Sequence, residues 1–217
     1  MHNLPNSARF PKYSYNTLSS SLKIQSHSSA LHEQAISTIS KGFILAADRL
    51  APELGQRTSV STNELYTGFV NQYKGSDKTP DMAFETWGST GPSRIKFVLE
   101  VGLAETYEML VEDTKMWLEG TKDVSAVMVV KLQENPNYRC PTRNLKNKDF
   151  AAQGFLESGE IGLDDFILEA TYGPAIYNQC IWVGRISGFI EIWKRDLVSG
   201  CAIRKGDSIV SEQLTEI

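Results

Sequence analysis

Two acidic residues, Asp81 and Glu100, stand in a stretch whose residue pattern is able to bring them together. Asp81 lies in the short segment 79–84, and Glu100 lies near the end of the apolar, β-branched segment 94–102. The residues between these segments, 86–92, are rich in turn formers. This pattern predicts a hairpin whose two strands each carry one carboxylate.

A pair of carboxylates on facing strands is able to bind a metal ion. An ionised side chain at the edge of an apolar strand needs a partner, because burying it alone costs several kcal/mol. Two converging carboxylates repel each other, and their hard oxygens suit Mg²⁺ or Mn²⁺. The alternative for Asp81 is a turn residue. The alternative for Glu100 is a salt bridge at the strand end with Arg94, Lys96 or Lys131.

The segments around the two acids predict an α/β fold. A stripe of apolar residues at three- and four-residue spacing predicts a helix over residues 29–50. A second such stripe predicts a helix over residues 103–119, and residues 124–132 are nearly all apolar, as expected of a buried central strand. Together with the strand that carries Glu100, this second helix and last strand form a βαβ unit with a right-handed crossover and parallel strands.

The order and spacing of these features resemble the PD-(D/E)XK nuclease superfamily, in which Pro-Asp on one strand is followed by an acid on the next. The chain is most similar to the Uma2-like group of restriction-endonuclease-fold proteins. The similarity spans residues 28–132. It consists of a serine-rich helix start with His32, the pair Pro80-Asp81, the segment 98–101, and the helix and apolar strand that follow. It implies a restriction-endonuclease-like mixed sheet flanked by helices.

The resemblance also divides the chain into three parts. Residues 1–27 are polar and Ser-rich with isolated aromatics, and are expected to form an arm over the surface, partly mobile. Residues 28–134 form the PD-(D/E)XK-like core. Residues 135–217 combine a basic loop with a β-rich extension packed on the core. Short strands are expected there at 166–172, 180–183, 188–195 and 203–210.

In this superfamily the two acids bind one divalent ion. The resemblance makes Asp81 and Glu100 the ligands of Mg²⁺ or Mn²⁺, with the main-chain carbonyl of Val101 as a third oxygen ligand. An acid on the first helix often completes such sites, and Glu33 is the candidate here. The alternative for Glu33 is a first-turn charge that complements the helix dipole. His32 is interpreted as a packed or capping residue rather than as a base.

The catalytic lysine departs from the family pattern. The third motif residue would stand at position 102, where this chain has Gly102. In the Uma2-like group a lysine has moved to the following helix, and the matching position here is Thr114, with Lys115 one residue later. One residue turns a helix by about 100°, so Lys115, the candidate transition-state cation, reaches the site only if the helix is rotated. Lys96 shares strand parity with Glu100 but lies about 13 Å back along the strand.

Four basic residues gather in the loop that follows the core: Arg139, Arg143, Lys146 and Lys148. One interpretation is a solvated loop. The other is a basic flap beside the acidic site that binds nucleic-acid phosphates.

Composition limits the class of protein. The chain has 217 residues, a net charge of −4 and a pI near 5.5, which argues against a strongly basic, non-specific nucleic-acid binder. No apolar run approaches the roughly 20 residues of a membrane span, and the first residues lack a signal-peptide pattern. The three cysteines, Cys140, Cys180 and Cys201, fit neither a disulfide framework nor a zinc site. We therefore expect an intracellular protein, cytoplasmic or nuclear.

Together these features predict a metal-dependent nuclease that hydrolyses DNA phosphodiester bonds with Mg²⁺ or Mn²⁺. The acidic balance and the missing lysine favour the alternative, a catalytically inactive nuclease-fold module that binds protein or nucleic acid. DNA is the expected partner, and no membrane association is expected. A homodimer is left open, because no stretch indicates an interface.

Overall fold

The computed structural model of the chain describes residues 12–25, 28–47, 49, 57–62, 64–87, 92–146, 149, 152–156 and 160–210. The chain divides into two compact units. Unit 1 consists of Met1–Val130 with Ile190–Ser208, and unit 2 of Lys131–Phe189 with Ile209–Ile217. None of the described helices is long and apolar enough to cross a membrane.

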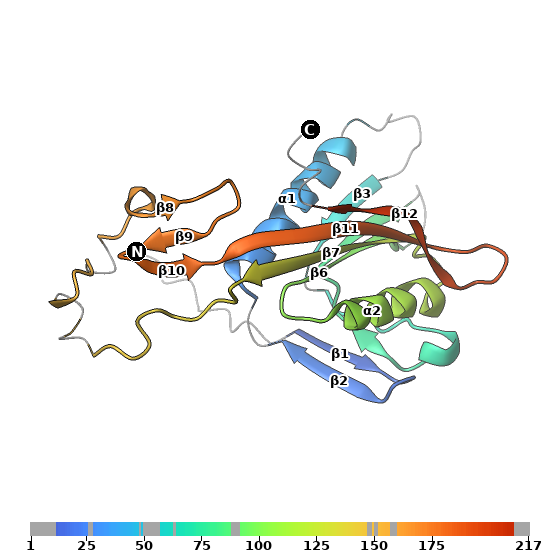
Figure 1. The fold of residues 1–217 in the computed structure, drawn as a ribbon. Coiled ribbons are helices and arrows are strands. Elements are labelled where there is room, and N and C mark those ends of the chain that lie inside the picture. The colour runs from blue at the N-terminus through green and yellow to red at the C-terminus, as the bar shows by residue number, and fades with distance from the viewer. Residues whose placement is uncertain are drawn as a thin grey trace, which may run out of the picture. The chain divides into compact units, whose positions relative to one another are not determined.

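The helices and strands of the core follow the predicted order of helix, three strands, helix and strand (Figure 1). In chain order they are α1 (Ala30–Ala47), β3 (Arg57–Ser61), β5 (Met82–Trp87), β6 (Arg94–Gly102), α2 (Tyr107–Gly120) and β7 (Ala126–Asn135). Two long strands, β11 (Arg185–Arg195) and β12 (Ala202–Val210), come near the end of the chain, after the short strands of unit 2.

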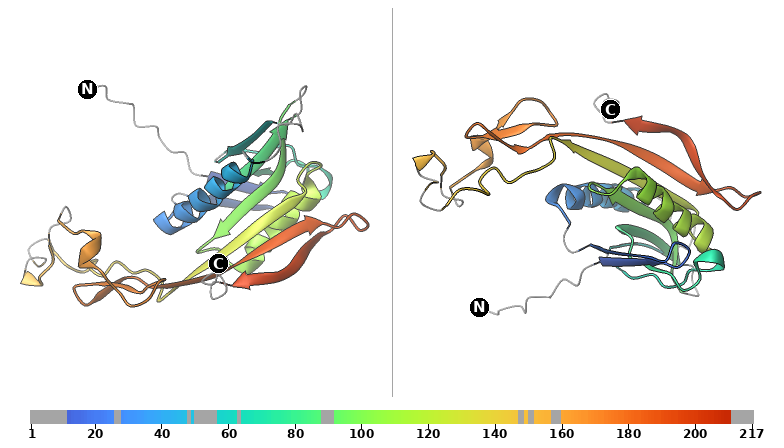
Figure 2. Two further views of the ribbon diagram at one scale, coloured as in Figure 1. Left: turned by 90° about the horizontal axis from the view of Figure 1, so that it is seen from above. Right: turned by 60° about the horizontal axis from the view of Figure 1, so that its bottom comes forward.

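These strands form one six-stranded mixed sheet with the order β12-β11-β7-β6-β5-β3, and the two helices flank it (Figure 2). Strands β3, β5 and β6 form an antiparallel meander, in which Val60 pairs with Phe84 and Met82 pairs with Leu99. The predicted α/β class and the mixed sheet flanked by helices are confirmed.

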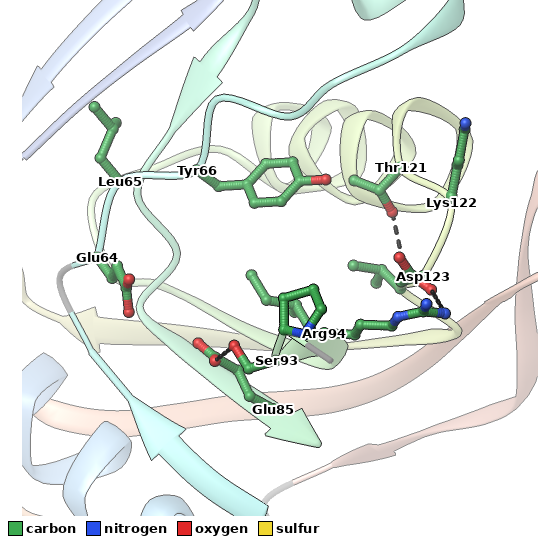
Figure 3. A pocket seen from close by; sticks show the side chains of 12 residues that line it. Glu64, Leu65, Tyr66, Glu85, Ser93, Arg94, Thr121, Lys122 and Asp123 are labelled. Carbon is green, nitrogen blue, oxygen red and sulfur yellow. Dashed lines mark hydrogen bonds and ion pairs between the residues drawn. The ribbon is translucent and has the colours of Figure 1, made fainter. Parts of the chain in front are cut away.

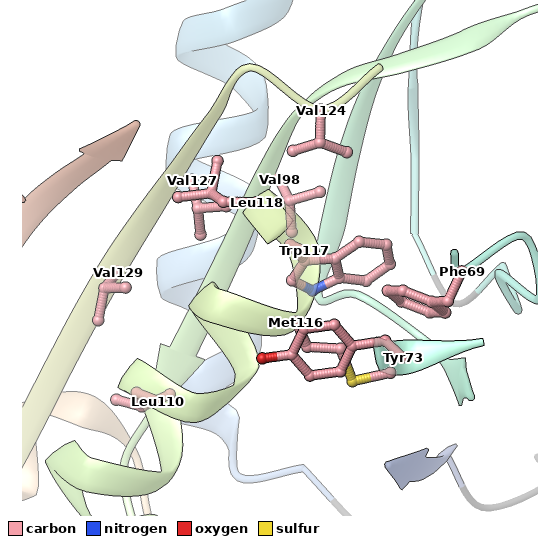
Figure 4. Packing of buried hydrophobic residues seen from close by; sticks show 10 residues of the cluster. All are labelled: Phe69, Tyr73, Val98, Leu110, Met116, Trp117, Leu118, Val124, Val127 and Val129. Atoms are coloured by element: carbon pink, nitrogen blue, oxygen red, sulfur yellow. The ribbon is translucent and has the colours of Figure 1, made fainter. Parts of the chain in front are cut away.

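Helix α2 and the strands beside it enclose the hydrophobic core. The cluster consists of Phe69, Tyr73, Val98, Leu110, Met116, Trp117, Leu118, Val124, Val127 and Val129 (Figure 4). The side chain of Thr106 caps the start of α2 by accepting a hydrogen bond from Met109 N at 3.3 Å. This cap explains why the helix begins at Tyr107 rather than at the expected residue 103.

Within the expected N-terminal arm, residues 12–25 fold as a hairpin, and residues 1–11 lie outside the described residues. Strands β1 (Lys12–Asn16) and β2 (Ser21–Gln25) pair antiparallel. On its other edge, β1 pairs antiparallel with the two-residue strand β4 (Asp77–Lys78). A further hydrogen bond links the hairpin to the residues before β4, because the main-chain N–H of Thr17 donates to Ser76 Oγ at 2.9 Å. This small sheet brings residues 12–25 beside the residues that precede Asp81.

Unit 2 contains a separate three-stranded sheet with the order β10-β9-β8. Its strands are β8 (Ile167–Leu168), β9 (Ala175–Tyr177) and β10 (Cys180–Val183). Four aromatic rings pack around it: Phe155, Phe166, Tyr177 and Trp182. The strand expected at 166–172 is only two residues long, and β9 was not expected, because such short strands carry little sequence periodicity.

Candidate carboxylate–lysine site

Asp81 and Glu100 face the same cavity. Met82 on β5 is paired with Leu99 on β6 in an antiparallel register. Asp81, which precedes Met82, and Glu100, which follows Leu99, are therefore neighbours. Both side chains are buried, with 6% of Asp81 and 4% of Glu100 exposed. Both line a cavity of about 400 Å³ in unit 1, together with residues of β1, β2, β4 and the start of α1.

Asp81 has three hydrogen-bonding or charged partners. Its Oδ1 lies 3.0 Å from Lys12 Nζ, and its Oδ2 accepts a hydrogen bond from Val101 N at 2.8 Å. Oδ2 also lies 3.3 Å from His32 Nε2. Burial by itself raises the pKa of Asp81, but His32, Lys12 and the Val101 N–H outweigh it, so the pKa lies below its usual value. Asp81 is therefore an ionised carboxylate held from three directions.

His32 is positioned by the start of α1. Its main-chain N–H donates to the capping hydroxyl of Ser29 at 3.1 Å, and its ring is 5% exposed. Burial lowers the pKa of His32, but the hydrogen bond and the charge of Asp81 prevail and raise it. His32 thus contacts a site carboxylate as well as packing, which goes beyond the packed or capping role expected from the sequence.

Glu100 lies between an indole and an ammonium group. Its Oε1 accepts a hydrogen bond from Trp117 Nε1 at 2.6 Å, and its Oε2 lies 3.5 Å from Lys78 Nζ. Burial raises the pKa of Glu100 to about 8; the charges of Asp81 and Asp113 act in the same direction, and Lys78 opposes them. Burial therefore shifts Glu100 toward its protonated form, in contrast to Asp81.

Lys78 is more deeply buried than Lys12, the other lysine that contacts a motif acid, and it was not a candidate in the sequence. It comes from β4, three residues before Asp81, is 4% exposed, and its Nζ lies 2.9 Å from Asp113 Oδ2. Burial lowers the pKa of Lys78, but Asp113 and Glu100 raise it well above its usual range, so the side chain is an ammonium ion. In the sequence, Lys78 could have been noticed because it stands just before the Pro80-Asp81 pair. The family pattern instead places the catalytic lysine after Glu100.

Asp113 is a second residue that the sequence did not indicate. It lies on the buried face of α2, is 3% exposed, and also binds Lys23 of β2, whose Nζ is 3.1 Å from Oδ1 and 3.0 Å from Oδ2. The sequence could have indicated that Asp113 is buried, because Asp113 lies next to the apolar stripe that contains Leu110 and Thr114. Asp113 and Lys23 together hold Lys78 beside Glu100.

The structure explains why position 102 carries no lysine. A Cβ atom built on Gly102 would lie 2.7 Å from Leu110 Cδ1 and 3.1 Å from two further atoms of that side chain. Leu110 belongs to the core and is fully buried, so it has little room to move. A side chain at position 102 would therefore require the buried Leu110 to shift.

Apart from Val101, the other described residues proposed from the sequence lie outside the cavity lining. Glu33 and Lys115 are exposed, and Lys115 does not reach the cavity, as the 100° rotation implied. Lys96 Nζ lies 3.3 Å from Asp123. Of the basic loop residues, Arg139, Arg143 and Lys146 belong to unit 2, and Lys148 lies outside the described residues. Val101 lines the cavity, and its N–H is bonded to Asp81.

The donor types at the site fit a hard divalent cation. Among the described residues there is no group of three His, Cys, Asp or Glu side chains arranged for a metal ion. Mg²⁺, however, is commonly bound through one or two carboxylates, with waters and substrate phosphates as the remaining ligands. Asp81 and Glu100 supply two carboxylates, and each contacts a lysine.

A larger cavity in unit 1, of about 680 Å³, shares no lining residue with the carboxylate–lysine site (Figure 3). Two of its acidic residues, Glu85 and Asp123, already have partners. Glu85 accepts hydrogen bonds from Ser61 at 2.8 Å and Ser93 at 2.6 Å, and Asp123 lies 3.5 Å from Arg94. The buried, mixed-charge set around Asp81 and Glu100 is therefore the stronger candidate for chemistry.

Comparisons of this chain with protein-family models, with curated proteins and with solved structures found no match. The likeness to PD-(D/E)XK nucleases stays a prediction from the sequence. Inference about function therefore starts from the geometry of the carboxylate–lysine site.

Proposed function

We propose that this chain is a metal-dependent nuclease that hydrolyses DNA phosphodiester bonds. The observation that supports the proposal is the meeting of two buried carboxylates and one buried lysine in a single cavity. Asp81 and Glu100 reach it from adjacent strands, and Lys78 Nζ stands 3.5 Å from Glu100 Oε2. Two acids and a lysine are the side-chain types that the resemblance requires, with the lysine supplied by β4 instead of position 102.

Each residue of the site has a separate task in this proposal. Asp81 and Glu100 hold Mg²⁺ or Mn²⁺, which when bound polarises a phosphodiester oxygen and lowers the pKa of a water ligand. Lys78 stabilises the negative charge that develops on the phosphoryl oxygens. Trp117 orients Glu100, and the Val101 N–H orients Asp81. These contacts fix the carboxylates before substrate arrives, so little reorganisation is needed during the reaction.

A second candidate function is the non-catalytic binding module. Lys12 on Asp81 and Lys78 on Glu100 partly neutralise the two acids within the chain. A site whose charges are balanced internally has less need of a divalent ion. This observation favours the module over the enzyme, and cleavage assays separate the two.

The direct test is incubation of the purified protein with plasmid DNA and Mn²⁺ or Mg²⁺, with EDTA as the control. We expect cleavage that EDTA abolishes and that Asp81→Ala or Glu100→Ala each remove. Lys78→Met should lower the rate by roughly 10²- to 10³-fold, as the loss of a charge-stabilising donor does elsewhere. Lys115→Ala is the matched lysine control and should keep the wild-type rate. Cleavage by Glu100→Ala, or none by the wild type, would reject the nuclease and leave the binding module.

A further inference from the structure

One face of the N-terminal hairpin is directed into the carboxylate–lysine cavity. In the register of β1 and β2, Lys12 is paired with Gln25 and Ser14 with Lys23. Side chains two residues apart on a strand share a face, so these four residues form one polar patch. All four line the cavity that contains Asp81. The hairpin therefore presents two ammonium groups, an amide and a hydroxyl to the site.

The opposite face of the same hairpin is apolar and exposed. Tyr15 is paired with Leu22 and Tyr13 with Ile24, and these side chains are 37–65% exposed; Ile24 also reaches the rim of the cavity. An antiparallel sheet that folds for burial alone turns its apolar face inward and its polar face to water. This hairpin does the reverse. Local rules of this kind are most often broken where a surface has a function.

Two ion pairs join the hairpin to buried acids of unit 1. Lys12 contacts Asp81 at 3.0 Å and Lys23 contacts Asp113 at 3.0 Å. Each ammonium group has three N–H donors, so it is able to hold a carboxylate and still donate to a second anion. Lys23 is the more accessible of the two, with 25% of its side chain exposed against 16% for Lys12.

We propose that this inward polar face, formed by Lys12, Ser14, Lys23 and Gln25, binds a backbone phosphate of the nucleic-acid substrate. The inference rests on the proposed nuclease function and adds to it the surface that positions the strand. Lysine, amide and hydroxyl donors are the groups that contact phosphates in protein–DNA interfaces, and such contacts fix register without reading bases. The patch adjoins the acids, so the phosphate that it holds is close to the one that would be cleaved.

The experiment measures binding rather than cleavage. Fluorescence anisotropy with a labelled DNA duplex, in the Glu100→Gln background that blocks cleavage, is recorded over a range of salt concentrations. We expect Lys23→Ala to weaken binding and to reduce the slope of log K against log[salt] by about 0.9, the value for one lost phosphate contact. Lys23→Arg should restore the slope. Gln25→Glu, at an exposed position, should also weaken binding because it adds like charge.

Two control variants make the result specific. Lys41→Ala removes an exposed lysine of α1 outside the patch, and Leu22→Thr changes the solvent face of the same hairpin. Both should bind DNA as the unsubstituted background does. A slope in Lys23→Ala equal to that in Lys41→Ala overturns the phosphate patch while leaving the nuclease proposal intact. Failure of the background protein to bind DNA at any salt concentration rejects both.

Discussion

At the scale of single residues, the two site acids lie side by side yet their surroundings act on them differently. Asp81 receives Lys12, His32 and the Val101 N–H, and these partners keep it ionised. Glu100 has one close donor, Trp117, and a lysine farther away, so burial dominates and its pKa rises to about 8. Replacing each acid by its neutral amide should therefore have different effects on stability.

The first prediction concerns Asp81→Asn. Two converging carboxylates with no cation between them would repel each other, and Asp81→Asn would then raise the melting temperature. The observed ion pair reverses the sign, because the substitution leaves Lys12 and His32 without a buried counter-charge. We expect a loss of roughly 3 kcal/mol of unfolding free energy, measured by thermal or urea unfolding in EDTA. Asp123→Asn, at a partly exposed acid beside Lys96, is the control and should change stability by less than about 1 kcal/mol.

The second prediction concerns metal binding without substrate. An ion that binds only the folded protein stabilises it by RT ln(1 + [L]/Kd), about 2.7 kcal/mol at a hundredfold excess over Kd. Mn²⁺ should therefore raise the melting temperature of the wild type, and should not raise that of Asp81→Asn or Glu100→Gln. A wild-type melt that is indifferent to Mn²⁺ would remove the metal site from the proposed function.

The third prediction concerns Glu191 of β11, a buried carboxylate, 3% exposed, that accepts four hydrogen bonds. Its donors are Tyr107, Trp193, Arg204 and Ser208. Burial raises the pKa of Glu191, but these donors outweigh it and lower the pKa overall. Because the pKa of Glu191 is lower in the folded state, Glu191 stabilises the fold at pH values above its unfolded-state pKa, near 4.5. This stability is lost as the pH falls through the folded-state pKa.

Glu191→Gln should accordingly be less stable than the wild type at pH 7, by roughly 1 to 3 kcal/mol. The difference should shrink as the pH falls below about 4. Urea unfolding at both pH values measures it. The matched control is Glu108→Gln, an exposed acid in the first turn of α2, whose effect should be small at both. A constant difference between pH 7 and pH 3 would contradict the lowered pKa of Glu191.

At the scale of helices and strands, the close packing of α2 on β6 decides where a lysine is able to stand. The fourth prediction follows from the contact of Gly102 with Leu110. Gly102→Lys restores the family motif but forces a side chain into a filled core, which should cost about 1 to 3 kcal/mol of unfolding free energy. Trimming the neighbour, in Gly102→Lys with Leu110→Ala, should cost less than the sum of the two single changes.

A second glycine provides the control for Gly102→Lys. A Cβ atom on Gly42 in α1 would meet nothing within 4 Å, so Gly42→Ala should stabilise the protein by about 0.5 to 1 kcal/mol. Equal effects at the two glycines would show that Leu110 moves aside easily. In that case packing would not explain the absence of a lysine at position 102.

The α/β order and the convergence of Asp81 and Glu100 were predictable, because long apolar stripes and a turn-rich hairpin carry strong local signals. The hairpin β1–β2 was not, because its polar face turns inward and its apolar face turns outward. Lys78 was missed for a related reason. It lies on a two-residue strand that pairs with β1 and bridges to Tyr66, and the distant pairing with β1 leaves no local pattern.

At the scale of the whole molecule, two of the lysines that line the cavity of the two acids, Lys12 and Lys23, come from the N-terminal hairpin, while the basic loop belongs to unit 2. The fifth prediction tests that loop separately. Replacing Arg143, Lys146 and Lys148 with alanine should weaken DNA binding and reduce the salt slope by about 0.9 per lost phosphate contact. Lys205→Ala, an exposed lysine of β12, is the control. An unchanged slope would make residues 139–148 a solvated loop.

The end of α2 depends on a residue made much later. Arg195 donates to the main-chain carbonyls of Leu118 and Thr121, and to that of Val124 at 3.1 Å. On a ribosome that adds roughly 5 to 20 residues per second, Arg195 is added about 4 to 15 seconds after Thr121. Until then these carbonyls lack their arginine donor. The nascent chain therefore exposes an unfinished core helix during this interval, and its dependence on chaperones should be greatest then.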